Sequence, residues 1–377
     1  MKKSCYCILL VLQASLVSAA DLYVATSGSD QNPGTIDRPL ATIQRAVDMV
    51  TPGETVYIRG GLYRQSIDLG GKAGAPDRPL TITNYRDEKV TFDGTTKIDS
   101  EWILDEGKVY KTVLDEDITQ LFVDGKLMTL ARFPNALAFS DEVWHRTQVR
   151  CTQSRESTNG QVVDASKEDK SIAAAGISLN GCVALMNFGA HATTSRRVEN
   201  HASGSGEFDY SPKLHKYKTT LNYFFEGGEG NAERRMLDRA QEWAYDESTK
   251  TLYPWADNGE NPNGHNIQGK VQTYAITGDA ATKHVVVNGL NFWATAFAFN
   301  SSDDVKIRNC NFDYYACSKR ALGVLGASET AHFAGTEKDF CKDITIYKCS
   351  FKYADATALH VGFAENILVE NNLFSRV

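Results

Sequence analysis

The feature that most constrains the fold is a strand-and-turn unit that recurs four times near the C-terminus. Each unit has a short alternating apolar stretch, a polar bend and a second short stretch that ends in phenylalanine. The four units are Val285–Phe292, Val305–Phe312, Ile344–Phe351 and Ile367–Phe374. Such a repeat is typical of stacked parallel β-coils, because each coil buries its inward side chains only against its neighbours. We therefore predict an all-β fold, a right-handed parallel β-helix, with the four phenylalanines in one interior row.

The N-terminal residues have the pattern of a secretory signal. Lys2 and Lys3 form its positive end, Ile8–Leu12 its apolar run, and Ser18–Ala20 a small-residue cleavage site. The apolar run is too short to span a bilayer, and no later segment resembles a membrane helix. We predict that residues 1–20 are a signal peptide and that the mature protein is secreted.

Three regions follow the predicted signal peptide. Residues 21–130 are predicted to form the first coils together with an N-terminal cap, in which the amphipathic stretch Ala41–Val50 is a short helix that covers the open end of the solenoid. Residues 131–255 break the repeat and are predicted to be an insertion of β-strands and loops. Residues 256–377 return to coils, and the chain stops at Val377 without a capping segment, which suggests a truncated solenoid.

Six cysteines remain after Cys5 and Cys7 leave with the signal peptide. An even number of cysteines in an oxidising compartment favours structural disulfides. The predicted pairs are Cys317 with Cys341 and Cys151 with Cys182, whereas Cys310 and Cys349 hold equivalent bend positions and could pair or simply stack.

Charge and motif spacing limit the ligands. The net charge of −7 argues against nucleic acid and anionic membranes as partners. No Cys/His spacing suggests zinc, and Asp303 and Asp304 fit a turn better than a calcium site. We therefore predict no cofactor, with calcium as a weak alternative.

Several motifs resemble those of known secreted proteins. Tyr23–Thr35, Arg38–Gln44 and Ile58–Arg64 resemble the N-terminal cap of right-handed β-helix proteins of the pectate-lyase superfamily. Leu130–Asn135 and the segment Leu237–Tyr253 are similar to β-helix glycoside hydrolases of the fucosidase and xylanase type. This resemblance implies the β-helix fold and a polysaccharide or oligosaccharide substrate, although one coil architecture hosts many reactions.

Aligning the coils places Ala298, Gly323 and His360 at matching outward positions, where two small residues leave a shallow groove. We predict Asp313, Asp355 and His360 as catalytic residues that share this face. Neighbouring coils lie about 4.8 Å apart, so carboxylates one coil apart fall near the ~5–5.5 Å separation of retaining hydrolases, and carboxylates two coils apart fall near the inverting range. The residues predicted to bind the substrate are Tyr314, Tyr315, Lys319, Arg320, Lys352 and Tyr353.

The leading hypothesis is a glycoside hydrolase that acts on an extracellular polysaccharide. A polysaccharide lyase is the first alternative; it would use Lys319, Lys352 or His360 as the base and Arg320 to neutralise a uronate carboxylate. The second alternative is a non-catalytic β-helix that binds glycans or serves as a surface or adhesion module. A convergent acid/base pair in one groove would favour the enzyme over the binding module.

Overall fold

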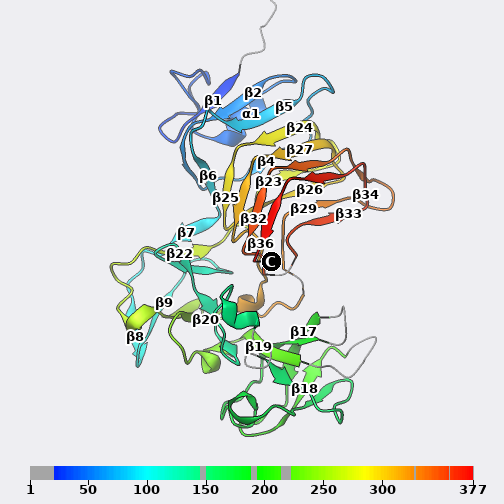
Figure 1. The fold of residues 1–377 in the computed structure, drawn as a ribbon. Helices are drawn as coiled ribbons and strands as arrows, with labels where there is room; N and C mark the ends of the chain where they lie inside the picture. The colour runs from blue at the N-terminus through cyan, green and yellow to red at the C-terminus, as the bar shows by residue number, and fades with distance from the viewer. Residues whose placement is uncertain are drawn as a thin grey trace, which may run out of the picture.

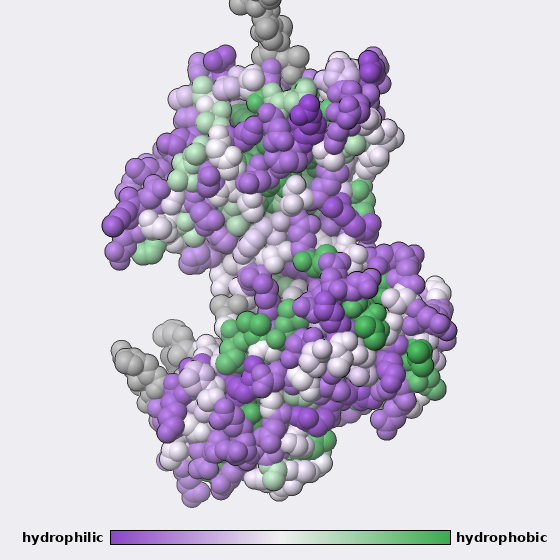
Figure 2. Space-filling view, turned by 180° about the vertical axis from the view of Figure 1, so that it is seen from behind, coloured by the Kyte–Doolittle hydropathy of each residue, from purple (hydrophilic) through white to green (hydrophobic). Residues whose placement is uncertain are grey.

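The computed structural model describes residues 21–144, 150–187, 193–213, 222–326, 328–355 and 357–376. The chain forms a solenoid, which holds both the first and the last strands, and an insertion of mostly antiparallel sheets below it (Figure 1). Seen from behind, the two lobes are separate masses with a notch between them on one side (Figure 2). The predicted signal peptide, residues 1–20, lies outside the described residues.

Three parallel sheets build the solenoid, and successive turns of the chain visit them in the order I, II, III. Sheet I contains β1 (Leu22–Val24), β2 (Thr55–Ile58), β5 (Leu80–Asn84), β24 (Lys283–Asn288), β27 (Asp303–Arg308), β30 (Cys341–Lys342), β31 (Thr345–Tyr347), β34 (Ala364–Glu365) and β35 (Leu368–Glu370). Sheet II contains β3 (Gly61–Tyr63), β6 (Val90–Asp93), β25 (Asn291–Trp293), β28 (Asn311–Asp313), β32 (Ser350–Lys352) and β36 (Leu373–Ser375). Sheet III contains β4 (Ile67–Asp68), β23 (Tyr274–Gly278), β26 (Ala296–Asn300), β29 (His332–Ala334) and β33 (His360–Gly362). This is the predicted right-handed parallel β-helix.

The predicted phenylalanine row is confirmed. The ring centroids of Phe292 and Phe312 lie 4.5 Å apart, those of Phe312 and Phe351 4.8 Å, and those of Phe351 and Phe374 5.1 Å, and all three pairs are stacked. Phe92 extends the row by one coil, at 5.2 Å from Phe292. Because the spacing equals the distance between adjacent strands, each ring packs against the same ring of the next coil.

The bends between sheets I and II use asparagine as the repeat suggests. Asn309 and Asn371 have left-handed backbone, with φ of 53° and 57°, a conformation that asparagine tolerates better than most residues. The Asn309 side chain also donates a hydrogen bond to Asn288 Oδ1 of the preceding coil at 2.7 Å. Cys310 follows the Asn309 bend, and Cys349 holds the equivalent place after Lys348, whose φ is 54°. Both thiols are free and buried.

The predicted N-terminal cap is present as helix α1 (Ile43–Met49). Thr42 is its N-cap, and the Thr42 hydroxyl accepts a hydrogen bond from the Arg45 amide at 3.3 Å, which satisfies one of the free amides of the first turn. Ile43, Ala46 and Val47 face the solenoid and are fully buried. The helix therefore closes the core above the first coil.

The break in the coils is longer than the predicted 131–255. Strand β6 pairs directly with β25, and β5 with β24, so the chain leaves the solenoid near Gly94 and returns near Tyr274. Residues 95–113 and 121–130 form strands that pair with the insertion instead of with coils. Short alternating strands have the same period in parallel and antiparallel sheets, so the sequence pattern could not separate them.

The insertion has three sheets and several single 3₁₀ turns. The first sheet contains β7 (Thr95–Lys97), β10 (Leu121–Val123), β11 (Lys126–Leu127) and β22 (Ile267–Lys270). The second contains β8 (Ile103–Glu106), β9 (Val109–Val113), β12 (Thr129–Leu130), β20 (Glu242–Asp246) and β21 (Thr251–Trp255). The third contains β13 (Arg132–Phe133), β14 (Cys151–Thr152), β15 (Gln161–Val163), β16 (Cys182–Asn187), β17 (Thr193–Glu199), β18 (Glu207–Ser211) and β19 (Asn222–Gly228). The turns are η1 (Asp141–Trp144), η2 (Glu168–Lys170), η3 (Glu233–Met236) and η4 (Asp257–Gly259).

The two predicted disulfides are wrong, because the six cysteines of the described chain are all free and buried. Cys317 lies against the insertion, with its Sγ 3.4 Å from Thr119 Oγ1, whereas Cys341 packs in the solenoid core. Cys151 and Cys182 both lie in the core of the insertion but on different strands, and their thiols contact different backbone carbonyls. These thiols therefore behave as small apolar core groups.

The predicted alignment of the outward row on sheet III is also wrong at one coil. Ala298 is in register with His332, and His332 with His360, so His332 occupies the place predicted for Gly323. Gly323 instead ends the 3₁₀ turn η5 (Arg320–Leu322), outside the sheet. The turn between β28 and β29 is longer than the neighbouring ones, and the alignment counted residues of that turn as a strand.

Candidate active site between the solenoid and the insertion

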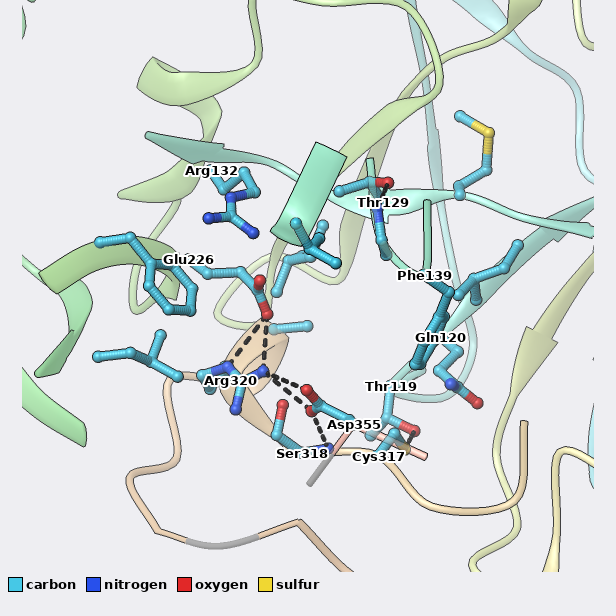
Figure 3. Close-up of a pocket in the computed structure, with 18 of the residues that line it drawn as sticks. Thr119, Gln120, Thr129, Arg132, Phe139, Glu226, Cys317, Ser318, Arg320 and Asp355 are labelled. Atoms are coloured by element: carbon cyan, nitrogen blue, oxygen red, sulfur yellow. Dashed lines mark hydrogen bonds and ion pairs between the residues drawn. The ribbon is translucent and has the colours of Figure 1, made fainter. Parts of the chain in front are cut away.

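A cavity of about 380 Å³ lies where the solenoid meets the insertion (Figure 3). The solenoid side contributes Ser318, Arg320, Asp355 and Arg376, and the insertion contributes Arg132, Phe139, Phe224, Glu226 and Trp243, among others. A mostly apolar lining with a few convergent charged groups is the usual composition of a small-molecule site. Among the described helices, none is long and apolar enough to cross a membrane.

The turn η5 carries the central residue of the site. It packs against β19 and β20 of the insertion and ends at Gly323, whose φ is +65°. A Cβ at Gly323 would lie 2.9 Å from the carbonyl oxygen of Gly228, so only glycine allows this close approach. The approach places Arg320, which is 5% exposed, at the base of the cavity.

Arg320 joins two carboxylates that come from different lobes. Its Nη2 atom lies 2.8 Å from Glu226 Oε1 on β19 and 2.9 Å from Asp355 Oδ1 in the turn after β32. Asp355 Oδ2 also accepts hydrogen bonds from the Ser318 amide at 2.9 Å and the Ser328 hydroxyl at 3.2 Å. Because both bonded oxygens share one nitrogen, they lie about 5.7 Å apart at most, within reach of the ~5–5.5 Å separation of retaining glycosidases.

This geometry sets the charge of Asp355. Burial alone would raise the pKa of the Asp355 carboxyl, but the charge and hydrogen bonds of Arg320 outweigh burial and hold that pKa below its usual value. The two carboxylates in turn raise the pKa of Arg320 against the opposing effect of its burial. Asp355 is therefore an anion at neutral pH and Arg320 a cation.

The cavity has a positive local balance. Arg132, Arg150, Arg320 and Arg376 line it together with only two carboxylates, although the whole chain has a net charge of −7. The Arg132 guanidinium lies 4.3 Å from the ring centroid of Phe224, over its face, an arrangement that stabilises a buried cation. The site is thus suited to a ligand with polar or acidic groups.

Two further acids are buried behind the cavity wall on or beside β20. Glu242 is fully buried, and burial together with the charge of Asp238 raises the pKa of its carboxyl to about 9. Burial also raises the pKa of Glu233, although the Tyr245 amide donates to its Oε1 at 2.9 Å. Glu242 is accordingly neutral at pH 7.

The three predicted catalytic residues do not share one face. Asp355 lines the cavity, but Asp313 lies on β28 of sheet II and His360 on β33 of sheet III, and neither lines the cavity. Burial raises the pKa of Asp313, and Lys352 on the neighbouring strand opposes this increase. His360 is exposed beside His332.

The predicted substrate-binding residues are also divided. Tyr314 and Tyr353 stack on each other, with ring centroids 4.4 Å apart, and both pack against Phe139, but neither lines the cavity. Tyr315 points instead into the solenoid core, where its hydroxyl donates to the Ala358 carbonyl at 2.6 Å. It follows the end of β28, and the left-handed backbone of Tyr314, with φ of 53°, breaks the strand alternation there. Lys319 forms an ion pair with Glu329 at 2.9 Å outside the cavity.

Sequence reasoning missed Glu226 and Phe139. Both come from the insertion, and Glu226 is 94 residues from Arg320 along the chain, so no coil alignment relates them. Strand β19 around Glu226 shows only the alternation of a half-buried strand. No local signal marks either residue as part of a site.

Comparisons with known proteins agree with this fold. Residues 22–200 match the family model described as Pel9A-like, right handed beta helix region. Pectate lyase PEL9 of Emericella nidulans is 46% identical over 79 residues, which are 21% of this chain and 19% of that protein. The uncharacterized protein YwoF of Bacillus subtilis is 37% identical over 81 residues, 22% of this chain and 17% of that protein. The matched segments thus span about a fifth of the length of these relatives.

A solved structure titled "Glycoside hydrolase" superposes with a TM-score of 0.65 and covers 94% of this chain and 78% of that one, at 15% identity. At this identity the similarity shows the fold alone. Fold and comparisons together define a right-handed parallel β-helix protein. Residues 22–200 are thus similar to a right-handed β-helix family, and the comparisons are consistent with the pectate-lyase-like superfamily.

Proposed function

We propose that this protein is a secreted carbohydrate-active enzyme, a glycoside hydrolase that cleaves a polysaccharide in the cavity between the lobes. The observation that carries the proposal is the pair of carboxylates, Glu226 and Asp355, bonded to one nitrogen of Arg320 in that cavity. Two carboxylates held this close to one nitrogen can reach the ~5–5.5 Å separation of a retaining glycosidase. The β-helix fold of a structure titled glycoside hydrolase and the match to a pectate lyase support a carbohydrate substrate.

Asp355 is the proposed nucleophile, because Arg320 keeps it ionised. Its Oδ1 attacks the anomeric carbon and forms an ester as the glycosidic C–O bond breaks. Glu226 is the proposed acid and base; Arg320 bonds only its Oε1, which leaves Oε2 as the atom that would exchange a proton with the leaving oxygen. Water then attacks the anomeric carbon, Glu226 takes the proton from that water, and Asp355 is released.

A lyase acting on a uronic-acid polymer is the second candidate, and the four arginines of the lining favour it. A guanidinium can neutralise a uronate carboxylate and so acidify the neighbouring C–H bond. The two reactions leave different products. Hydrolysis consumes water and gives two saturated sugars, whereas elimination consumes none and gives an unsaturated sugar that absorbs ultraviolet light.

The test uses the purified full chain on a panel of neutral and uronic-acid polysaccharides, with both product assays run together. For a substrate that the parent cleaves, Asp355→Asn and Glu226→Gln should each lower kcat by about 10²–10⁴-fold. Asp313→Asn is the matched control, since Asp313 lies outside the cavity, and it should keep full activity. With aryl glycosides whose good leaving groups need no proton, Glu226→Gln should keep the first step, seen as a burst of released phenol, while the second step stays slow. Full activity in Asp355→Asn would reject the proposal, and an unsaturated product would favour the lyase.

A further inference from the structure

We propose that Phe139 is the sugar-stacking wall of the cavity and thereby selects substrates whose ring presents a flat C–H face beside Glu226 and Asp355. This inference rests on the proposed function for the identity of the ligand as a glycan. It assigns a binding role to a residue of the insertion, on the loop after β13. Phe139 and Arg132 lie on opposite sides of the cavity (Figure 3).

The ring of Phe139 is supported from behind. It meets Tyr353 edge-on at 5.6 Å and 72°, and Tyr314 at 6.3 Å and 68°. These two tyrosines are themselves stacked with an interplanar angle of 8°. Edge-to-face packing of this kind is favourable and fixes the orientation of a ring. The side chain therefore presents a rigid surface to the cavity and loses little freedom when a ligand binds.

The backbone of Phe139 is held in an unfavourable conformation. Its φ is +57°, a region that bulky residues rarely enter and glycine enters freely. The Arg376 guanidinium, which also lies 3.8 Å from Asp141, donates a hydrogen bond to the Phe139 carbonyl. Such strained positions persist where the surroundings enforce them and are common at ligand sites. A glycine would suit the backbone better, so the phenylalanine ring needs another reason to be there.

The chemistry of the cavity indicates what the ring meets. The carboxylates and arginines can bond sugar hydroxyls, whereas the Phe139 ring offers no hydrogen bond and an electron-rich face. The axial C–H bonds of a pyranose form a flat face that packs well on such a ring. A sugar stacked on Phe139 would turn its hydroxyls toward the charged side of the cavity and so be oriented for reaction.

Measurements of glycan affinity distinguish a sugar-binding role of Phe139 from a purely structural one. Calorimetric titrations use Glu226→Gln as the non-hydrolysing parent, with tetrasaccharides of xylose, galactose, fucose and galacturonate as probes. Adding Phe139→Gly should weaken binding of the best probe at least tenfold, about 1.4 kcal/mol, while the melting temperature stays equal or rises because strain is removed. Phe363→Gly is the matched control: Phe363 also has positive φ, 47°, but lies outside the cavity, so affinity should not change.

Phe139→Trp and Phe139→Leu are further variants that test the inference even if the glycine variant misfolds. The tryptophan variant keeps a flat ring and should bind within about threefold of the parent, whereas leucine should lose affinity like glycine. Unchanged affinity in the glycine or leucine variant overturns the inference, and so does a panel in which no probe binds. If Glu226→Gln binds a probe through Phe139 but the unaltered protein cleaves no glycan, the hydrolase proposal fails and the inference about Phe139 stands. If the unaltered protein cleaves a glycan and the Phe139→Gly variant binds that glycan equally well, the hydrolase proposal stands and the inference about Phe139 fails.

Discussion

Replacing Arg320 with methionine tests whether the shared guanidinium holds the two lobes together. The change keeps an unbranched side chain but leaves Glu226 and Asp355 facing each other without a cation. Removing one partner of a buried ion pair costs about 3–5 kcal/mol. The Arg320 side chain is 6% exposed, but those of Glu226 and Asp355 are 17% and 27% exposed, so we expect the lower end of this range, about 3 kcal/mol.

The effect should depend on pH in a defined direction. Arg320 lowers the pKa of Asp355 in the folded state. The stabilising contribution is therefore fully present above the unfolded-state pKa of about 3.9 and is lost as the pH falls through the lower folded-state value. The stability difference between parent and Arg320→Met should be largest near pH 7 and shrink below about pH 4.

Urea denaturation, followed by tryptophan fluorescence near pH 7 and below about pH 4, measures the stability difference between the parent and Arg320→Met. Arg376→Met is the control, since Arg376 lines the same cavity but is 44% exposed, and it should cost about 1 kcal/mol or less. A loss below about 1 kcal/mol for Arg320→Met at neutral pH, or a loss that persists unchanged in acid, would show that the guanidinium does not stabilise the contact between the lobes through Asp355.

Three further predictions concern the core. Phe312→Ala should lower the free energy of unfolding in denaturant by about 3–5 kcal/mol, because the Phe312 ring is fully buried between two others. Phe374 is 39% exposed at the end of the row, so Phe374→Ala should lower it by well under half of that. Equal losses in the two variants would contradict the stacked row. Glu242→Gln should raise the melting temperature at pH 8, because folding there forces the Glu242 carboxyl, whose folded pKa is about 9, to bind a proton, which glutamine does not need. The gain should vanish near pH 4, where the carboxyl is largely protonated in the unfolded state too. A gain independent of pH would exclude this cause. Protein lacking residues 1–20 should react with a thiol-specific dye at all six cysteines after denaturation without reductant, and fewer reactive thiols would restore the disulfide hypothesis.

The parts of the fold that repeat could be predicted from the sequence. Phe292, Phe312 and Phe351 occupy the same place in successive units, and identical places in a solenoid are neighbours in space. The N-terminal capping helix could also be predicted, because Thr42 and the apolar spacing after it are local signals of a helix start.

The site could be predicted only in part, because its residues meet through pairings that have no period. Asp355 was identified from its turn in the coil, but its partner Glu226 lies on an antiparallel strand of the insertion. His360 was chosen from a coil alignment that placed Gly323 in sheet III. That alignment is wrong, because η5 and Gly323 lie outside the sheet and pack on the insertion. Contacts between lobes depend on tertiary packing, which a coil alignment does not contain.

The most direct test of the account is to trap the glycosyl-enzyme. Glu226→Gln is incubated with an aryl glycoside of the sugar that the parent cleaves, so that the first step proceeds and the second slows. The protein is then digested and the adduct located by mass spectrometry. We expect a single sugar adduct on the peptide that contains Asp355. An adduct on another carboxylate, such as Asp313, or turnover that survives in Asp355→Asn, would contradict the assignment of the cavity as the active site.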